Sequence, residues 1–196
     1  MKKILSALLI LICVFSVMSF TTVLAVEQKP VLWEWEPYGD GVSLKEYKGT
    51  QTDVYIPATV EKDGVEYNVL KLGDNLFKDN TAINSATLSE GITEIGVSAF
   101  EGATNLVCIV TPESLTTIGE NAFYGCTNFN SVILYDSVTS IGKNAFSGCD
   151  ILTIYCNENN GGYLYAVQND VKYILLRATS PSKETIAGIS YFILSG

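Results

Sequence analysis

The eleven residues TTIGENAFYGC, Thr116–Cys126, return almost unchanged as TSIGKNAFSGC, Thr139–Cys149, 23 residues later. A third copy, TEIGVSAFEGA, begins at Thr93, and a more divergent fourth, LKLGDNLFKDN, begins at Leu70. A fixed period in the twenties is typical of a solenoid, in which each repeat buries its apolar side against the next. The sequence therefore predicts a stack of similar coils.

Each copy contains an apolar-glycine pair, a phenylalanine four residues after the glycine, and then a short apolar run. The pairs are Leu72-Gly73, Ile95-Gly96, Ile118-Gly119 and Ile141-Gly142, and the phenylalanines are Phe77, Phe100, Phe123 and Phe146. The runs, such as FNSVIL, are short and rich in strand formers, which predicts parallel strands about 4.8 Å apart. The segment around the phenylalanine is too short for a free helix, and its glycine offers a position open to positive φ. We expect one strand, one return segment and two corners per unit, with the phenylalanines in a continuous internal ladder.

The pattern IGxxAFxxCxxLxxVxL resembles the BspA-type leucine-rich repeats of bacterial and some protozoan surface proteins. Residues 93–115 and 116–138 match closely, and 139–156 matches in its first half. The copy at 70–92 departs at Leu76 and Asn80. Upstream, Ile56-Pro57 and a turn at Asp63-Gly64 are similar to the entry unit of such proteins, so the similarity spans roughly 42–176. The resemblance implies an α/β-type repeat solenoid of short parallel strands with helical or turn return segments.

The two ends are expected to cap the stack, because an open solenoid needs covered ends. Around Gly39-Asp40-Gly41 the sequence indicates a β-hairpin, and near its other end a helix over 163–168 and a strand over 172–176. The expected parts are a signal peptide (1–25), an N-terminal cap and entry repeat (26–69), repeats (70–92, 93–115, 116–138, 139–156), a C-terminal cap (157–177), and a linker with a tail strand (178–196). That tail either adds to the sheet edge or begins a further module.

The N-terminal segment indicates export. Lys2 and Lys3 precede an apolar run from Ile4, and Val23-Leu24-Ala25 is a small-residue cleavage pattern, so we expect cleavage after Ala25. The alternative is an uncleaved anchor helix. The whole chain has a net charge of −9, and removal of 1–25 leaves 10 Lys+Arg against 21 Asp+Glu, a net charge of −11. Such a charge disfavours nucleic acid, and without a second long apolar run we expect a secreted or surface protein with no membrane insertion after cleavage.

Residues that usually carry catalysis or bind metal are scarce. The chain has no histidine, which removes the usual general base and the commonest zinc ligand. The cysteine spacings match no zinc pattern, no glycine-rich phosphate loop is present, and the loop 157–162 has one carboxylate, too few for calcium. We therefore predict no catalytic residue, cofactor or metal, and a pair of scattered carboxylates is the remaining route to an enzyme.

Two cysteines share one repeat position. Cys126 and Cys149 occupy the site filled by Ala103 in the preceding copy, which favours small buried packing residues, with a disulfide between neighbouring coils as the open alternative. Cys108 and Cys156 are expected in strands two coils apart, about 10 Å, too far for a bond.

Trp33 and Trp35 alternate with glutamates, so both rings point the same way. They are expected to form either an apolar lid over the first coil or a sugar-stacking platform.

Alternation within each strand separates buried from outward positions. The inward residues are predicted to be Ala86, Ile109, Val132, Leu88, Thr111 and Leu134. The predicted outward columns are Ser85, Cys108, Ser131, Ile154 and Thr87, Val110, Ile133, Cys156. The candidate binding face consists of Ser85, Thr87, Cys108, Val110, Ser131 and Ile133. Neighbouring Val110 and Ile133 on an open face indicate an interaction site, although strand propensity or a covering tail strand would also explain them. Tyr124, on the return segment, is a further possible contact.

The resemblance implies non-catalytic binding of an extracellular protein or glycan, as in adhesion. The alternatives are a structural spacer in a larger cell-envelope protein or assembly and, more remotely, a carboxylate-dependent hydrolase.

Overall fold

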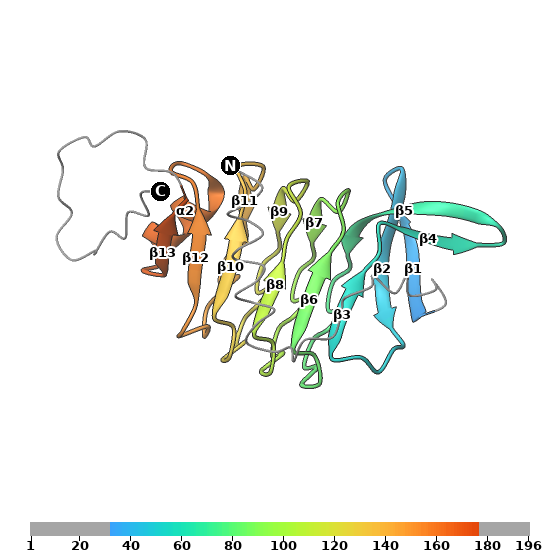
Figure 1. Cartoon of the computed structure of the whole chain (residues 1–196), viewed down its shortest axis with the longest axis horizontal. Coiled ribbons are helices and arrows are strands. Elements are labelled where there is room, and N and C mark those ends of the chain that lie inside the picture. Colours follow the sequence, from blue (N-terminus) through green and yellow to red (C-terminus); the bar gives the residue numbers. More distant parts are fainter. Residues whose placement is uncertain (1–31, 177–196) are drawn as a thin grey trace, which may run out of the picture.

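A computed structural model describes residues 32–176, and these form a β-solenoid of stacked coils (Figure 1). One sheet, here called the first sheet, contains only parallel strands, in the order β13-β12-β10-β8-β6-β3. Its strands are β3 (Asp53–Ile56), β6 (Ser85–Leu88), β8 (Cys108–Val110), β10 (Ser131–Leu134), β12 (Thr153–Cys156) and β13 (Lys172–Leu175). The predicted fold class is confirmed.

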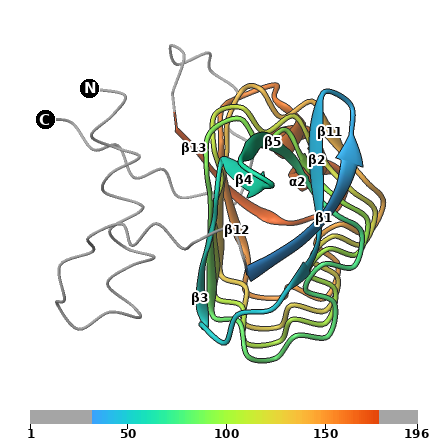
Figure 2. The same cartoon turned by 90° about the vertical axis from the view of Figure 1, so that its right-hand side faces the viewer.

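The second sheet has the order β1-β2-β5-β7-β9-β11, with β4 paired to β5. Its strands are β1 (Trp33–Tyr38), β2 (Gly41–Tyr47), β4 (Thr59–Lys62), β5 (Val65–Leu72), β7 (Glu94–Ile95), β9 (Thr117–Ile118) and β11 (Ser140–Ile141). Each middle coil thus has two strands rather than the predicted one, because the two residues before each glycine pair with the coil below. A strand of two residues is too short to show the period-2 alternation by which strands are recognised in a sequence. Seen along the stack, the two sheets lie on opposite sides of the coil (Figure 2).

The return segments are chains of tight turns and contain no helix. Neighbouring coils are joined there by backbone hydrogen bonds, in which Phe100 N–H donates to the Ala122 carbonyl at 2.7 Å and Phe123 N–H to the Ala145 carbonyl at 2.8 Å. This ladder satisfies backbone groups that a buried turn would otherwise leave without partners. The motif therefore recurs because the turn of each coil must form these backbone hydrogen bonds with the turn of the next coil.

The glycines of the apolar-glycine pairs are required by close approach, not by positive φ. A Cβ on Gly119 would lie 2.6 Å from the Gly96 carbonyl carbon, and one on Gly142 would lie 2.6 Å from that of Gly119. Positive φ occurs instead later in the unit, for example at Asn121 (54°) and Gly125 (71°). The expectation that the motif's glycine serves positive φ is wrong for the position after the isoleucine.

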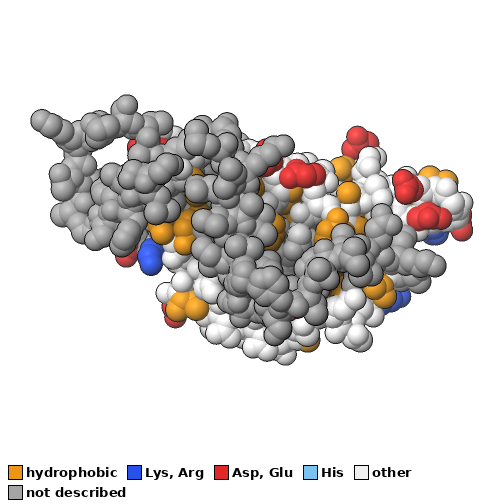
Figure 3. Space-filling view, viewed as in Figure 1, with side chains coloured by type: hydrophobic (Ala, Val, Ile, Leu, Met, Phe, Trp, Pro, Cys, Tyr) orange, Lys and Arg blue, Asp and Glu red, His pale blue; other side chains and the backbone are white. Residues whose placement is uncertain are grey.

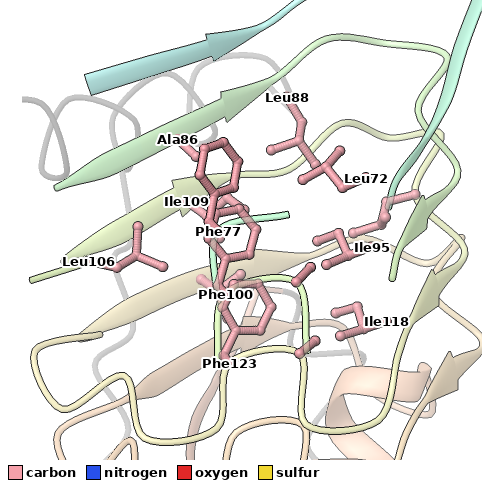
Figure 4. Close-up of a cluster of buried hydrophobic side chains, with 14 of the residues drawn as sticks. Leu72, Phe77, Ala86, Leu88, Ile95, Phe100, Leu106, Ile109, Ile118 and Phe123 are labelled. Atoms are coloured by element: carbon pink, nitrogen blue, oxygen red, sulfur yellow. The ribbon is translucent and has the colours of Figure 1, made fainter. Parts of the chain in front are cut away.

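The phenylalanine ladder is confirmed. Centroids of Phe77 and Phe100 are 5.1 Å apart, and those of Phe100 and Phe123, and of Phe123 and Phe146, are 5.2 Å apart. Figure 4 shows three of these rings stacked between the side chains of the two sheets. All six predicted inward residues are buried. The core is thus a column of aromatic faces enclosed by aliphatic side chains.

Two hairpins shape the N-terminal end. The predicted turn between β1 and β2 is present, with Gly39 at φ 60°. Asp63 and Gly64 both have positive φ between β4 and β5, as a two-residue hairpin of type I′ requires. The β4–β5 hairpin projects away from the stack (Figure 1).

Helix α2 (Gly161–Gln168) and β13 close the C-terminal end, which confirms the predicted helix and strand. Asn160 is the N-cap: its side chain accepts from Tyr163 N–H at 2.9 Å, and its Nδ2 donates to the Leu134 carbonyl at 2.8 Å. The asparagine-rich loop is thus a helix cap tied to the coil below.

Within residues 32–176, no helix has the length and apolar character needed to cross a bilayer. The predicted signal peptide and the predicted tail strand lie outside the described residues.

Candidate binding face

The outward side chains at the middle of the first sheet form a continuous row across six strands. Strand pairing places Tyr55 beside Thr87, Thr87 beside Val110, Ile133 beside Tyr155 and Tyr155 beside Ile174. The pairing of Val132 with Ile109 brings Val110 and Ile133 together as the next residues of β8 and β10. We call Tyr55, Thr87, Val110, Ile133, Tyr155 and Ile174 the apolar row.

The row is open to solvent, most of all at its ends. Tyr55 is 41% exposed and Ile174 is 44% exposed, while Val110, Ile133 and Tyr155 are half-buried. Figure 3 shows apolar side chains on this side of the molecule. The structure therefore places the predicted Thr87, Val110 and Ile133 in a longer row than the sequence indicated.

A second outward column lies beside the apolar row, and its four middle positions carry short side chains. It contains Asp53, Ser85, Cys108, Ser131, Thr153 and Lys172. Cys108 is in the predicted column but is only 3% exposed, because its short side chain lies low between two flanking strands. It offers no surface to a partner, which corrects its place in the candidate face.

The predicted orientation of the last coil is wrong. Thr153, not Ile154, pairs with Ser131, so Ile154 and Cys156 point inward and are fully buried. The distance along the chain from the coil's phenylalanine to its strand is one residue shorter here than in the previous coil, and a shift of one residue exchanges the two faces of a strand. Tyr155 thereby joins the apolar row.

Acidic side chains line the corners that follow the strands of the first sheet. Glu90, Glu113 and Asp136, here called the acidic row, occupy equivalent positions and are exposed. The Glu90 carboxylate accepts from Glu113 N–H at 3.1 Å, and Asp136 accepts from Asn157 Nδ2 at 2.7 Å. Equal 23-residue spacing is the signal by which the sequence could have shown this row.

The opposite sheet carries a charged cluster that is fully engaged within the protein. Lys71 Nζ lies 2.7 Å from the Glu94 carboxylate and 3.1 Å from that of Asp74. Tyr38 donates its hydroxyl to Glu94 at 2.6 Å, and this hydrogen bond raises the pKa of Tyr38. Burial lowers the pKa of Lys71, but its hydrogen bonds to the two carboxylates outweigh burial and raise it. The cluster ties the N-terminal hairpin to the repeats.

The described cysteines are buried thiols outside any disulfide. Cys126 Sγ donates to the Phe100 carbonyl at 3.0 Å and Cys149 Sγ to the Phe123 carbonyl at 3.1 Å. Interaction with Cys149, followed by burial, raises the pKa of Cys126, and burial raises that of Cys156 to about 12. Cys126 and Cys149 thus fill the core and bridge neighbouring coils, which is the packing role expected from the position they share with Ala103.

Of the two tryptophans, Trp33 is the lid. It is 5% exposed and packs against Tyr47 and Phe77, with ring centroids 4.6 Å and 6.2 Å away. Trp35 is half-buried against Tyr67, with centroids 4.9 Å apart. Tyr124 is exposed on the return segment, as expected. Among the described residues, no group of three or more His, Cys, Asp or Glu side chains is placed to hold a metal ion.

Comparison with protein families matches residues 55–166 to the BspA type leucine rich repeat region, in six copies. The chain belongs to this family. The match begins in β3, before the four copies visible in the sequence, and ends within α2. The BspA-type repeats therefore cover the first sheet from the second half of β3 to β12.

Solved structures agree with this BspA-type fold. A leucine-rich repeat protein from Bacteroides capillosus is 28% identical with a TM-score of 0.59, over 67% of this chain and 97% of that one. A leucine-rich repeat protein of T. pallidum is 24% identical with a TM-score of 0.51, over 66% and 71%. The pneumococcal vaccine antigen PcpA is 24% identical with a TM-score of 0.51, and the match covers 64% of this chain but 31% of PcpA. A comparison with curated proteins gives no match.

Proposed function

We propose that this BspA-type protein is exported and binds an extracellular protein or glycan, without catalysis, through the outer face of the first sheet. The observation that carries the proposal is the apolar row, in which side chains of six neighbouring strands line up on a solvent-facing surface. Contiguous exposed apolar side chains mark interaction sites more often than scattered ones do. Export rests on the predicted signal peptide.

The architecture suits recognition because the face is already ordered before a partner arrives. Each outward side chain is anchored by inward neighbours that are buried in the core, such as Ile109 and Val132 beside Val110 and Ile133. Binding then loses little backbone freedom, and this lowers the entropic cost of association. Six strands give a face about 24 Å wide, which suits a small interface of modest affinity.

The competing function is a structural spacer. Valine, isoleucine and tyrosine are strong strand formers, so strand propensity alone would enrich them in the apolar row. A spacer needs no partner on this face. The two functions therefore differ in whether a ligand binds the outer face of the first sheet.

The test is a binding screen of the purified protein against extracellular proteins and glycans, with a Val110→Asp/Ile133→Asp variant beside it. Tyr124→Asp serves as a control, since Tyr124 is 48% exposed on the return segment, away from the first sheet. Circular dichroism establishes that all three proteins are folded. A ligand that binds the unmodified protein and the control but not the double variant supports the proposal. A ligand retained by the double variant contradicts the proposed face and places the site elsewhere, and the absence of any ligand contradicts the proposal and favours the spacer.

A further inference from the structure

Charge is distributed unevenly around the solenoid. Within the described strands of the first sheet and the corners that follow them, Lys172 in the last strand is the only basic residue. The other described lysines lie in the hairpins, the second sheet and the return segments: Lys45, Lys48, Lys62, Lys71, Lys78 and Lys143. In Figure 3 several acidic side chains lie along the upper edge of the described surface and others lie near its ends, where the visible lysines also lie. Among the described strands of the first sheet and their corners, acidic residues therefore outnumber the single lysine.

The acidic row runs parallel to the apolar row. Glu113 follows Val110 by three residues, and Asp136 follows Ile133 by three residues, which places the two rows at most about 10 Å apart along the strands. Glu90 has the same relation to Thr87. A partner that covers the apolar row thus meets carboxylates along one edge.

The dimensions match an α-helix laid across the strands. Strands repeat about every 4.8 Å, close to the 5.4 Å rise of one helical turn, so successive turns can each meet one strand. The row spans about 24 Å, the length of about 16 helical residues. A helix is about 10–12 Å thick, which puts the long basic side chains on its flank within reach of carboxylates about 10 Å from its line of contact.

The column of short side chains provides room on the other flank. Ser85, Ser131 and Thr153 are smaller than their neighbours Thr87, Ile133 and Tyr155 in the apolar row. The apolar row consequently stands above a shallower strip, into which the apolar side chains of a helix can project.

We infer that the face binds a cationic amphipathic helix, whose apolar stripe lies on the apolar row and whose lysine or arginine flank faces the acidic row. This inference rests on the proposed function and names the chemistry of its partner. Net charge complementarity also speeds the encounter, because the whole chain is negative at −9.

The probe is a labelled 18-residue peptide with a leucine stripe at helical spacing and lysines on both flanks. A peptide of the same composition in scrambled order and a peptide with glutamate in place of lysine are its controls. Binding to the full-length protein is followed by fluorescence anisotropy at low and at high ionic strength. The scrambled peptide keeps the charge but loses the stripe, and the glutamate peptide keeps the stripe but reverses the charge. Together they distinguish binding through an apolar stripe from binding through charge attraction alone.

Two triple variants of equal net charge locate the interaction. Glu90→Gln/Glu113→Gln/Asp136→Asn neutralises the acidic row while keeping oxygen acceptors. Its control neutralises three exposed carboxylates on the β4–β5 hairpin: Glu61→Gln/Asp63→Asn/Glu66→Gln. A third variant, Val110→Thr/Ile133→Thr, removes apolar contacts without adding charge and keeps β-branched side chains. Thermal unfolding of each variant establishes that the fold is retained.

We expect the striped lysine peptide to bind, and both the acidic-row variant and the threonine variant to weaken it about tenfold. The hairpin variant should change the affinity less than about twofold, because the β4–β5 hairpin projects away from the stack (Figure 1) and salt screens exposed charges. Equal weakening by the two triple variants, equal binding of striped and scrambled peptides, or no binding of the striped peptide would each overturn the inference. The proposed function would survive those results if the screen still finds a ligand that Val110→Asp/Ile133→Asp loses.

Discussion

Trp33 and Tyr165 close opposite ends of one aromatic column, each with its ring nearly perpendicular to the adjacent phenylalanine. The Trp33 ring meets Phe77 at 88° with centroids 6.2 Å apart, and the Tyr165 ring meets Phe146 at 78° and 5.4 Å. Between them the phenylalanine rings are close to parallel, with 5–17° between planes. The edge-on rings end a stack that would otherwise expose an aromatic face to water.

Removal of a ring from the middle of this column should destabilise the protein strongly. Phe123 is fully buried and stacks on Phe100, Phe129 and Phe146. We expect Phe123→Ala to lower the free energy of unfolding by about 3–5 kcal/mol, measured by urea denaturation. Tyr124→Ala, which removes the exposed neighbouring ring, should change it by less than about 0.5 kcal/mol. Similar losses in the two variants would contradict the stacked core.

The hydroxyl of Tyr165 should matter separately from its ring. It accepts a hydrogen bond from the buried Phe146 N–H at 3.1 Å. Tyr165→Phe keeps the ring and leaves this N–H without a partner, so we expect a loss of about 1–3 kcal/mol in unfolding free energy. Tyr124→Phe is the matched control and should be neutral. An unchanged stability in Tyr165→Phe would mean that the helix end is not fixed by this bond.

Two glycines of the same repeat should respond differently to alanine. Gly119→Ala places a Cβ against the backbone of the coil below, whereas Gly125, at φ 71°, has nothing within 4 Å of such an atom. We expect Gly125→Ala to cost about 1–2 kcal/mol from the left-handed backbone alone. Gly119→Ala should cost more, because rigid backbone atoms must move apart. Thermal unfolding should therefore give Gly119→Ala the lower midpoint. A lower midpoint for Gly125→Ala would contradict the tight contact between coils.

Stability should decline at alkaline pH in part through the buried thiols. Burial raises the pKa of Cys156 from 9.0 to about 12, so the folded state holds the thiol proton more tightly than the unfolded state does. This contribution is complete below pH 9 and is lost as the pH rises toward 12. Between pH 8 and pH 11, we expect the unfolding free energy of the unmodified protein to fall more steeply than that of Cys156→Ala. Tyr38 and Lys71, which also titrate there, remain in both proteins, and parallel curves would contradict the prediction.

The repeat spacing was sufficient to predict the stack, the phenylalanine ladder and the inward residues of the first sheet. Those features depend on period, which a sequence displays directly. The glycine of each apolar-glycine pair was expected to provide positive φ, but it is required by the close approach of the neighbouring coil. That approach is a property of the stack, which one motif does not display. The second sheet was missed since its two-residue strands, such as Thr117–Ile118, have no periodicity of their own.

The candidate face was predicted only in part. Val110 and Ile133 were found from alternation, but Ile154 and Cys156 were placed outward because a fixed 23-residue frame was carried across a one-residue deletion. Tyr55 and Ile174 lie in the entry coil and the cap, where the repeat pattern is weak. Cys108 shows that an outward position in a strand need not be exposed. The acidic row follows the 23-residue spacing of the sequence. That its three residues form a row follows only from the structure, in which they lie at equivalent corners of neighbouring coils.

The most direct test of the account compares the dissociation constant of a ligand captured in the screen for the unmodified protein and for Val110→Asp/Ile133→Asp. If the first sheet is the binding face, two carboxylates introduced into the apolar row would lose water beneath the ligand and should weaken binding at least about a hundredfold, while the unfolding midpoint of the free protein stays close to that of the unmodified protein. Equal dissociation constants in two equally folded proteins would show that the ligand binds elsewhere and would remove the first sheet as the binding face.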